Sequence, residues 1–180
     1  MKWLCSIVVI LVTWQAQAPP LRYWIKFSER SADLENPRAV RNCVLVRDDG
    51  AVHIERMEWR DSTYYSGQLT KEEVAQLRTL ATHPELVKLQ VVPPELTSVR
   101  GYRSLEHVII RIWRGDHEQE LELLNVDGQT PLPEQMQPIR GYLSALAKRE
   151  FPKDDKLKNA KVCVETERRG PQKGRKRITP

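Results

Sequence analysis

The chain has 180 residues, of which 40% are hydrophobic, a length and composition suited to one domain with a substantial core. Its net charge of +5 is concentrated at one end, because residues 153–180 hold ten Lys or Arg against four Asp or Glu. The rest of the chain is close to neutral, so the charge gives no reason to expect a nucleic-acid-binding domain. We expect no specific nucleic-acid recognition.

The first 18 residues follow the pattern of a secretory signal peptide. Lys2 supplies a positive charge, residues 4–14 are apolar, and Ala16 and Ala18 give a small-residue cleavage pattern. The apolar stretch is too short to span a bilayer comfortably. We therefore expect export, to the periplasm or the medium, and no transmembrane span in the mature chain. Pro19 would follow the cut and hinders signal peptidases, so whether cleavage falls after Ala18 stays open.

Residues 21–30 alternate in polarity and indicate a half-buried strand. A β-hairpin is predicted next, over residues 42–60, around Asp48-Asp49-Gly50. A two-residue turn there would either set Arg47 opposite Val52 or need two aspartates at positive φ. A three-residue turn ending in Gly50 instead gathers the branched side chains on one face. This register pairs Val46 with Val52 and Val44 with Ile54.

Residues 61–68 are rich in turn formers, and we expect a loop there. A helix should follow, because Thr70 and Glu73 form a capping box and Leu69 can contact Val74 as a hydrophobic staple. We expect this helix to bury Leu77 and to be interrupted at His83-Pro84.

The second predicted hairpin covers residues 106–125, with a two-residue Gly115-Asp116 turn. In this register apolar residues pair on one face, and oppositely charged residues pair on the other. Each face supports the register independently. The pairs are Ile110 with Leu121, Val108 with Leu123, Arg111 with Glu120 and Trp113 with Glu118. The same turn holds Arg114-Gly115-Asp116, a cell-adhesion tripeptide, but a tight turn itself favours Gly-Asp.

A second helix is predicted after Asp127-Gly128. It would bury residues at helical spacing, and Pro138 marks either its start or a kink. The buried stripe is Met136, Ile139, Leu143 and Leu146.

Export would leave Cys43 and Cys163 in an oxidising compartment, with one possible pairing. Residues 160–166 alternate, so that Cys163 points away from Val162 and Val164. If this segment forms a strand beside residues 42–47, the two sulfurs emerge on the same side of the sheet within bonding reach. We predict both the Cys43–Cys163 disulfide and this strand pairing.

Residues 167–180 show no hydrophobic period, and we expect a disordered basic tail. Such a tail could bind an anionic polymer or an envelope surface. Alternatively, it only keeps the protein soluble. Its cations are Arg168, Arg169, Lys173, Arg175, Lys176 and Arg177.

Together these elements predict an α+β domain over residues 19–166, between the signal peptide and the tail. One antiparallel sheet of five to six strands would combine the two hairpins with an N-terminal and a C-terminal strand. Both helices would pack on one face of the sheet, with Tyr23 and Ile25 in the core between them.

The opposite face of the sheet is a candidate binding face. Aromatic and cationic side chains would share it, a combination suited to stacking on bases or sugar rings. Residues 91–101 or a second subunit would otherwise cover the two tryptophans. The residues of this face are Trp24, Lys26, Arg111 and Trp113.

No catalytic, phosphate-binding or dinucleotide motif occurs, and the four histidines lack metal-ligand spacing. We therefore expect no catalytic residue, no cofactor and no metal site.

The order of strand, hairpin, helix begun by Leu69-Thr70 and Glu73, hairpin and helix resembles small bacterial exported α+β domains. Among these it is most similar to the emfourin-type inhibitors of thermolysin-like metallopeptidases, over residues 23–150. The connection at residues 28–41 and the basic tail depart from that pattern. The resemblance implies a non-enzymatic role in binding another protein. We expect a small exported binding or inhibitor-like protein; a tail-mediated surface binder and an unrecognised enzyme are the alternatives.

Overall fold

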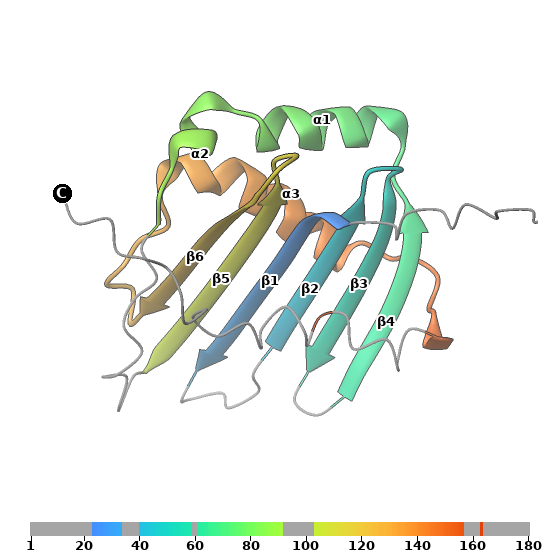
Figure 1. Cartoon of the computed structure of the whole chain (residues 1–180). Helices are drawn as coiled ribbons and strands as arrows, with labels where there is room; N and C mark the ends of the chain where they lie inside the picture. Colours follow the sequence, from blue (N-terminus) through green and yellow to red (C-terminus); the bar gives the residue numbers. More distant parts are fainter. Residues whose placement is uncertain (1–22, 34–39, 59–60, 92–102, 157–162, 164–180) are drawn as a thin grey trace, which may run out of the picture.

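The computed structural model describes residues 23–33, 40–58, 61–91, 103–156 and 163. These residues form one antiparallel sheet with the strand order β4-β3-β2-β1-β5-β6 (Figure 1). The strands are β1 (Tyr23–Asp33), β2 (Val40–Arg47), β3 (Ala51–Glu58), β4 (Asp61–Gln68), β5 (Ser104–Trp113) and β6 (Glu118–Val126). The helices are α1 (Lys71–Ala81), α2 (Pro84–Lys88) and α3 (Gln137–Lys148), and a short 3-10 turn, η2 (Glu134–Met136), leads into α3. The α+β class predicted from the sequence is confirmed.

Both hairpin registers are confirmed. Val46 lies opposite Val52 in the first hairpin, where Gly50 has a φ of 83° and its amide donates to the Arg47 carbonyl at 2.9 Å. Ile110 lies opposite Leu121 in the second, and Gly115 has a φ of 101°. Glycine adopts this left-handed conformation at little cost, so it fixes where each strand turns.

Residues 61–68 are a strand, β4, and not the loop predicted from their composition. Every residue of β4 lies opposite one of β3, from Asp61 facing Glu58 to Gln68 facing Ala51. Pairing with a neighbouring strand outweighs the weak intrinsic preference of serine and glycine for turns.

The predicted strand at residues 160–166 is wrong as a partner of β2. β2 already pairs with β1 on one side and β3 on the other, so neither of its edges can receive a further strand. Cys163 itself is helical, and its neighbours on both sides lie outside the described residues. The sixth strand of the sheet is therefore β4.

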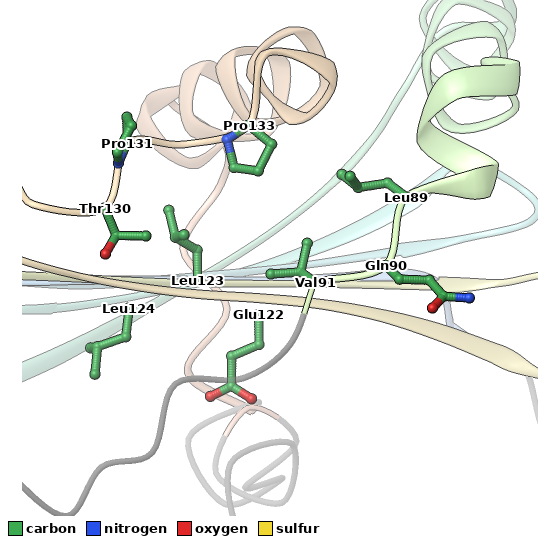
Figure 2. A pocket seen from close by; sticks show the side chains of 9 residues that line it. All are labelled: Leu89, Gln90, Val91, Glu122, Leu123, Leu124, Thr130, Pro131 and Pro133. Carbon is green, nitrogen blue, oxygen red and sulfur yellow. The ribbon is translucent and has the colours of Figure 1, made fainter. Parts of the chain in front are cut away.

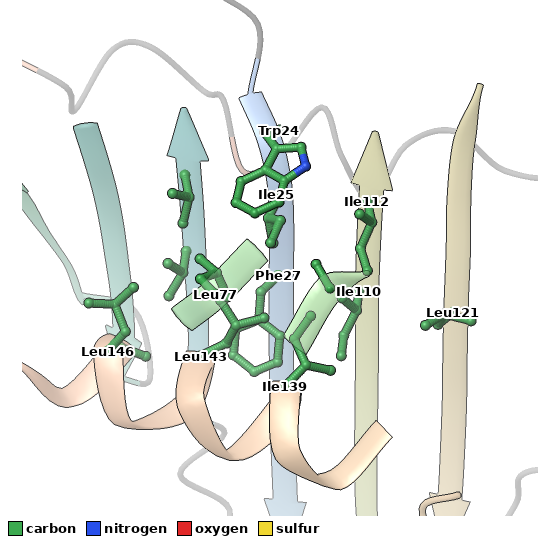
Figure 3. Close-up of a cluster of buried hydrophobic side chains, with 14 of the residues drawn as sticks. Trp24, Ile25, Phe27, Leu77, Ile110, Ile112, Leu121, Ile139, Leu143 and Leu146 are labelled. Atoms are coloured by element: carbon green, nitrogen blue, oxygen red, sulfur yellow. The ribbon is translucent and has the colours of Figure 1, made fainter. Parts of the chain in front are cut away.

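The core lies between the sheet and the helices, and α1 and α3 run along the same side of the sheet (Figures 1 and 3). Phe27 of β1, Leu77 of α1 and Leu143 of α3 are fully buried in this single cluster, which we call the helix-side core. The capping box is confirmed at the start of α1, with Glu73 N donating to Thr70 Oγ1 at 3.2 Å. α3 begins at Gln137, so Pro138 lies in the first turn, where its missing N–H breaks no helical bond.

A bulge in β1 changes which side chains face the helices. Tyr23 lies opposite Arg47 and Ile25 opposite Val46, so Trp24 is an extra residue on β1. Trp24 consequently joins the helix-side core, whereas Tyr23 packs on the other side of the sheet, against Cys43, Leu45 and Cys163. We call that other side the far face. The sequence prediction placed Tyr23 in the core and Trp24 on the other face. Both placements are reversed, because simple alternation ignores the bulge.

Candidate binding site at the edge of the sheet

One edge of the sheet, strand β4, is covered by the chain's own C-terminal segment. Ser66 N donates to Pro152 O at 3.1 Å, Asp154 N donates to Tyr64 O at 3.0 Å, and Tyr65 and Lys153 form an isolated antiparallel bridge. These bonds satisfy part of the backbone edge that an end strand would otherwise expose.

The ring of Phe151 packs on Gly67 of β4 and strengthens the contact between β4 and the covering segment. A Cβ on Gly67 would lie 1.9 Å from Cδ1 of Phe151, so the ring occupies the space of the missing side chain. The Arg149 guanidinium in turn lies 4.8 Å from the centroid of the Phe151 ring.

The other edge, strand β6, has a different environment. Within the part of the chain that the structure describes, β5 is the strand that pairs with β6, and no strand pairs with its outer side. A groove of about 240 Å³ borders this outer side (Figure 2). We call it the edge groove, and it is lined by Leu89, Gln90, Val91, Glu122, Leu123, Leu124, Thr130, Pro131 and Pro133.

The edge groove extends over both sides of the β6 edge. Leu123 points to the helix side, toward Pro133 and Val91, whereas Glu122 and Leu124 point to the far face (Figure 2). Its walls are mostly apolar, and two of its residues are prolines, which lack the backbone donor that a neighbouring strand could use.

Both walls of the edge groove are positioned by side chains of β6 itself. The Gln119 amide donates to the carbonyl oxygens of Leu86 at 2.9 Å and Leu89 at 3.2 Å, which holds the segment after α2. At the other end the Asn125 side chain accepts a hydrogen bond from Thr130 N at 3.0 Å. The groove is therefore a built feature of the β6 edge, fixed at both ends to one strand.

On the far face β6 presents a row of glutamates that bind cations of the inner strands. Glu118 Oε2 accepts from Lys26 Nζ at 3.0 Å, and Glu120 Oε2 accepts from Arg111 Nε at 2.5 Å. Glu122 Oε1 is 2.8 Å from Nε2 of His107. This hydrogen bond holds the pKa of Glu122 below its ordinary value, against the opposing effect of burial.

The four residues of the predicted binding face do not come together. Lys26 and Arg111 lie on the far face and pair with glutamates of β6. Trp24 is buried in the helix-side core, where the Arg78 guanidinium lies 5.0 Å from its ring centroid, and Trp113 packs against the same core. The prediction of one open face with all four residues is therefore wrong for Trp24, which lies in the helix-side core.

The predicted disulfide is present. Cys43 and Cys163 are joined with a Cα–Cα distance of 6.2 Å, and both are buried on the far face beside Leu45. Arg41 Nη2 donates to the Cys163 carbonyl at 3.1 Å, which adds a second link to the same residue. The bond joins the middle of the sheet to a residue beyond the segment that covers β4.

Arg114 of the cell-adhesion tripeptide has a structural role. Its Nη1 donates to the Ala81 carbonyl at the end of α1 at 2.6 Å, and its Nε donates to Gln119 Oε1 at 3.0 Å. The tripeptide thus serves the hairpin turn and a helix end. The predicted signal peptide (residues 1–18) and the basic tail (residues 167–180) lie outside the described residues.

One cluster resembles the parts of a catalytic triad, namely His53, Ser66 and Asp154. The Ser66 hydroxyl donates to Asp154 Oδ2 at 2.9 Å, and the buried Nδ1 of His53 has no hydrogen-bond partner. A nucleophilic serine needs its hydroxyl bonded to the base, so this arrangement does not activate Ser66. Burial also lowers the pKa of His53, which favours the neutral imidazole.

The described residues contain no group of three or more His, Cys, Asp or Glu side chains placed to hold a metal ion. None of their helices is long and apolar enough to cross a bilayer.

Comparison with known proteins gives no relative. No family model, no curated protein and no solved structure matches the chain.

The edge groove was missed by sequence reasoning. Its walls come from residues 89–91 and 130–133, which follow helical and turn signals and carry no motif of their own. The alternation of Glu and Leu in residues 118–123 was visible, but alternation alone does not reveal that this strand ends the sheet.

Proposed function

We propose that the protein is a small, exported, non-enzymatic binding protein that holds an extended segment of another protein along strand β6. The observation that carries the proposal is the contrast between the two sheet edges. The chain covers β4 with its own residues 152–154, whereas β6 has a groove fixed along its outer side.

The physical basis is strand addition. The outer edge of an end strand carries backbone N–H and C=O groups that an incoming strand can pair with, and side-chain pockets beside it supply selectivity. Leu123, Leu124 and Val91 provide such a pocket, and the walls are held by Gln119 and Asn125 before any partner arrives. A preformed groove lowers the ordering cost of binding.

Export and an inhibitor-like role are part of the same proposal. A buried disulfide is typical of oxidising compartments, which supports export. The resemblance to emfourin-type inhibitors supports a peptidase as the partner. Its direct test is whether the purified protein inhibits a thermolysin-like metallopeptidase.

The strand-binding proposal is tested by filling the edge groove. Thr130 is exposed at the rim, and only its backbone nitrogen is engaged, so Thr130→Trp should obstruct the groove without disturbing the core. Gln129→Trp is the matched control, because Gln129 is exposed next to it and does not line the groove. Peptides selected on the native protein from a random displayed library are the ligands.

We expect the selected peptides to slow hydrogen exchange at β6 amides and to bind Thr130→Trp at least about tenfold more weakly, a loss of 1.4 kcal/mol or more. Gln129→Trp should bind as the native protein does. Equal binding to both variants, or protection confined to other strands, would refute the proposal.

A further inference from the structure

The β6 strand presents two chemically different rows of side chains along its edge. Glu118, Glu120 and Glu122 lie on the far face, and Leu121 and Leu123 belong to the helix-side core. A strand added along β6 would therefore meet carboxylates with one set of its alternate side chains and an apolar surface with the other.

From this we infer the chemical class of the partner: an extended segment with Lys or Arg at alternate positions and apolar residues between them. The inference rests on the proposed function and specifies what the β6 edge selects. The cations of the partner would face the glutamates, and its apolar residues would enter the edge groove beside Leu123, Pro133 and Val91.

The glutamates keep capacity for such a partner although each already binds an inner cation. A carboxylate accepts about four hydrogen bonds, and one oxygen of Glu120 and one of Glu122 make the pairs with Arg111 and His107. Glu120, the most accessible of the three, has 38% of its side chain exposed. A cation of the partner would lie on the outer side of the β6 glutamates, whereas the cations of β1 and β5 lie on their inner side.

The same row argues against two other occupants. Pairing β6 with β6 of a second copy would bring glutamates of one strand against glutamates of the other, and like charges on facing strands are destabilising. An acidic partner strand meets the same repulsion. Charge thus selects the partner, while the groove and the backbone edge supply the rest of the interaction.

The experiment uses three short capped peptides and the full-length protein. The first peptide alternates Lys with Val, the second replaces each Lys with Glu, and the third has the composition of the first with its Lys residues grouped at one end. Affinity is measured by calorimetry at low and high salt, and the bound site is located by hydrogen exchange. We expect the first peptide to bind along β6, the third to bind weakly and the second not to bind.

The protein variants test the named carboxylates. Glu120→Gln combined with Glu122→Gln should weaken the binding of the alternating Lys peptide roughly twofold to thirtyfold, the effect of two cross-strand charge pairs. Arg111 keeps Glu118 within 3.9 Å in this variant, so the sheet retains a partner for that cation. Glu72→Gln, an exposed glutamate on α1, is the control with one charge removed elsewhere.

The outcomes separate this inference from the proposed function. If all three peptides protect β6 equally and Thr130→Trp blocks them, strand binding stands and the charge selectivity is refuted. If none of the three peptides protects β6, whereas peptides selected from the random library do, strand binding stands and the inference of a cationic partner is refuted. If neither set protects β6, both proposals fall.

One further result would also refute the inference. Loss of binding in the Gln variants without protection of β6 would indicate surface attraction only.

Discussion

The two edges of the sheet solve the same physical problem in different ways. An end strand exposes backbone donors and acceptors, and natural proteins usually cover or blunt it. At β4 the chain returns after α3 and places residues 152–154 along the strand, with Phe151 against Gly67. At β6 the flanking segments are tied to Gln119 and Asn125, and they form the walls of a groove beside residues 122–124.

The composition of the two strands matches this difference. β4 is rich in Ser, Thr and Tyr, and the Ser66 hydroxyl donates to Asp154 of the covering segment. β6 alternates Glu with Leu and keeps its charged row on the far face. The contrast shows that the chain covers the β4 edge with its own residues 152–154, and it is the basis of the binding role proposed for the β6 edge.

The largest loss of stability should come from breaking the Cys43–Cys163 disulfide, which anchors the chain beyond the segment that covers β4. Cys43 and Cys163 are 120 positions apart in the sequence, for which the chain-entropy model gives about 4–5 kcal/mol of stabilisation. We expect reduction to lower the free energy of unfolding, measured in urea, by that order. Exchange at the Ser66 and Asp154 amides should accelerate more than exchange at β6 amides.

The native protein should have a mass two daltons below that of the reduced protein. Cys43→Ala combined with Cys163→Ala is the control, and it should match the reduced protein and no longer respond to reductant. Two free thiols found by alkylation of natively purified protein would contradict the disulfide.

Much of the sheet could be predicted because local patterns specify it. The turn at Gly50 and the charge pairing of Arg111 with Glu120 each allow one good register, and both registers are observed. The disulfide was predicted correctly for a partly wrong reason. The two sulfurs do meet on the same side of the sheet, but β1 and β3 occupy both edges of β2, so no third strand is involved.

The remainder depends on tertiary structure that a sequence pattern does not contain. β4 is a strand because β3 pairs with it, although its serines and glycine suggest a loop. Trp24 is buried because a single bulged residue reverses the faces at the start of β1. The edge groove requires knowing that β6 ends the sheet, which only the strand order gives.

An intermediate effect is expected from Gly67→Ala, which acts on the covered edge. The new Cβ would lie 1.9 Å from the Phe151 ring, so the ring must leave its place and residues 152–154 should loosen from β4. Overpacking of this kind costs about 1–3 kcal/mol. Unfolding in urea gives the loss of stability, and hydrogen exchange at Ser66 and Asp154 reports the loosening.

Gly141→Ala is the matched control for that substitution. Gly141 lies in α3, where an added Cβ would point into open space, so alanine there should stabilise the protein by about 0.5–1 kcal/mol through its better helix propensity. Equal and small effects of the two substitutions would show that Phe151 does not hold the segment against β4.

The smallest loss of stability should come from Glu122→Gln on β6, and its dependence on pH is distinctive. The hydrogen bond from His107 lowers the pKa of Glu122 in the folded protein, so the unfolded chain binds a proton at Glu122 more readily. The resulting stabilisation is complete above the ordinary glutamate pKa of about 4.3 and is lost as the pH falls through the lowered value of the folded state.

A half-buried pair of this kind is worth about 0.2–1 kcal/mol. We therefore expect Glu122→Gln to be less stable than the native protein at pH 7, and we expect this difference to shrink as the pH falls below the ordinary glutamate pKa, as measured by urea unfolding at pH 7 and at one acidic pH. A difference that stayed constant between the two pH values would mean that Glu122 stabilises the β6 edge by packing, and the row of carboxylates would lose its electrostatic role.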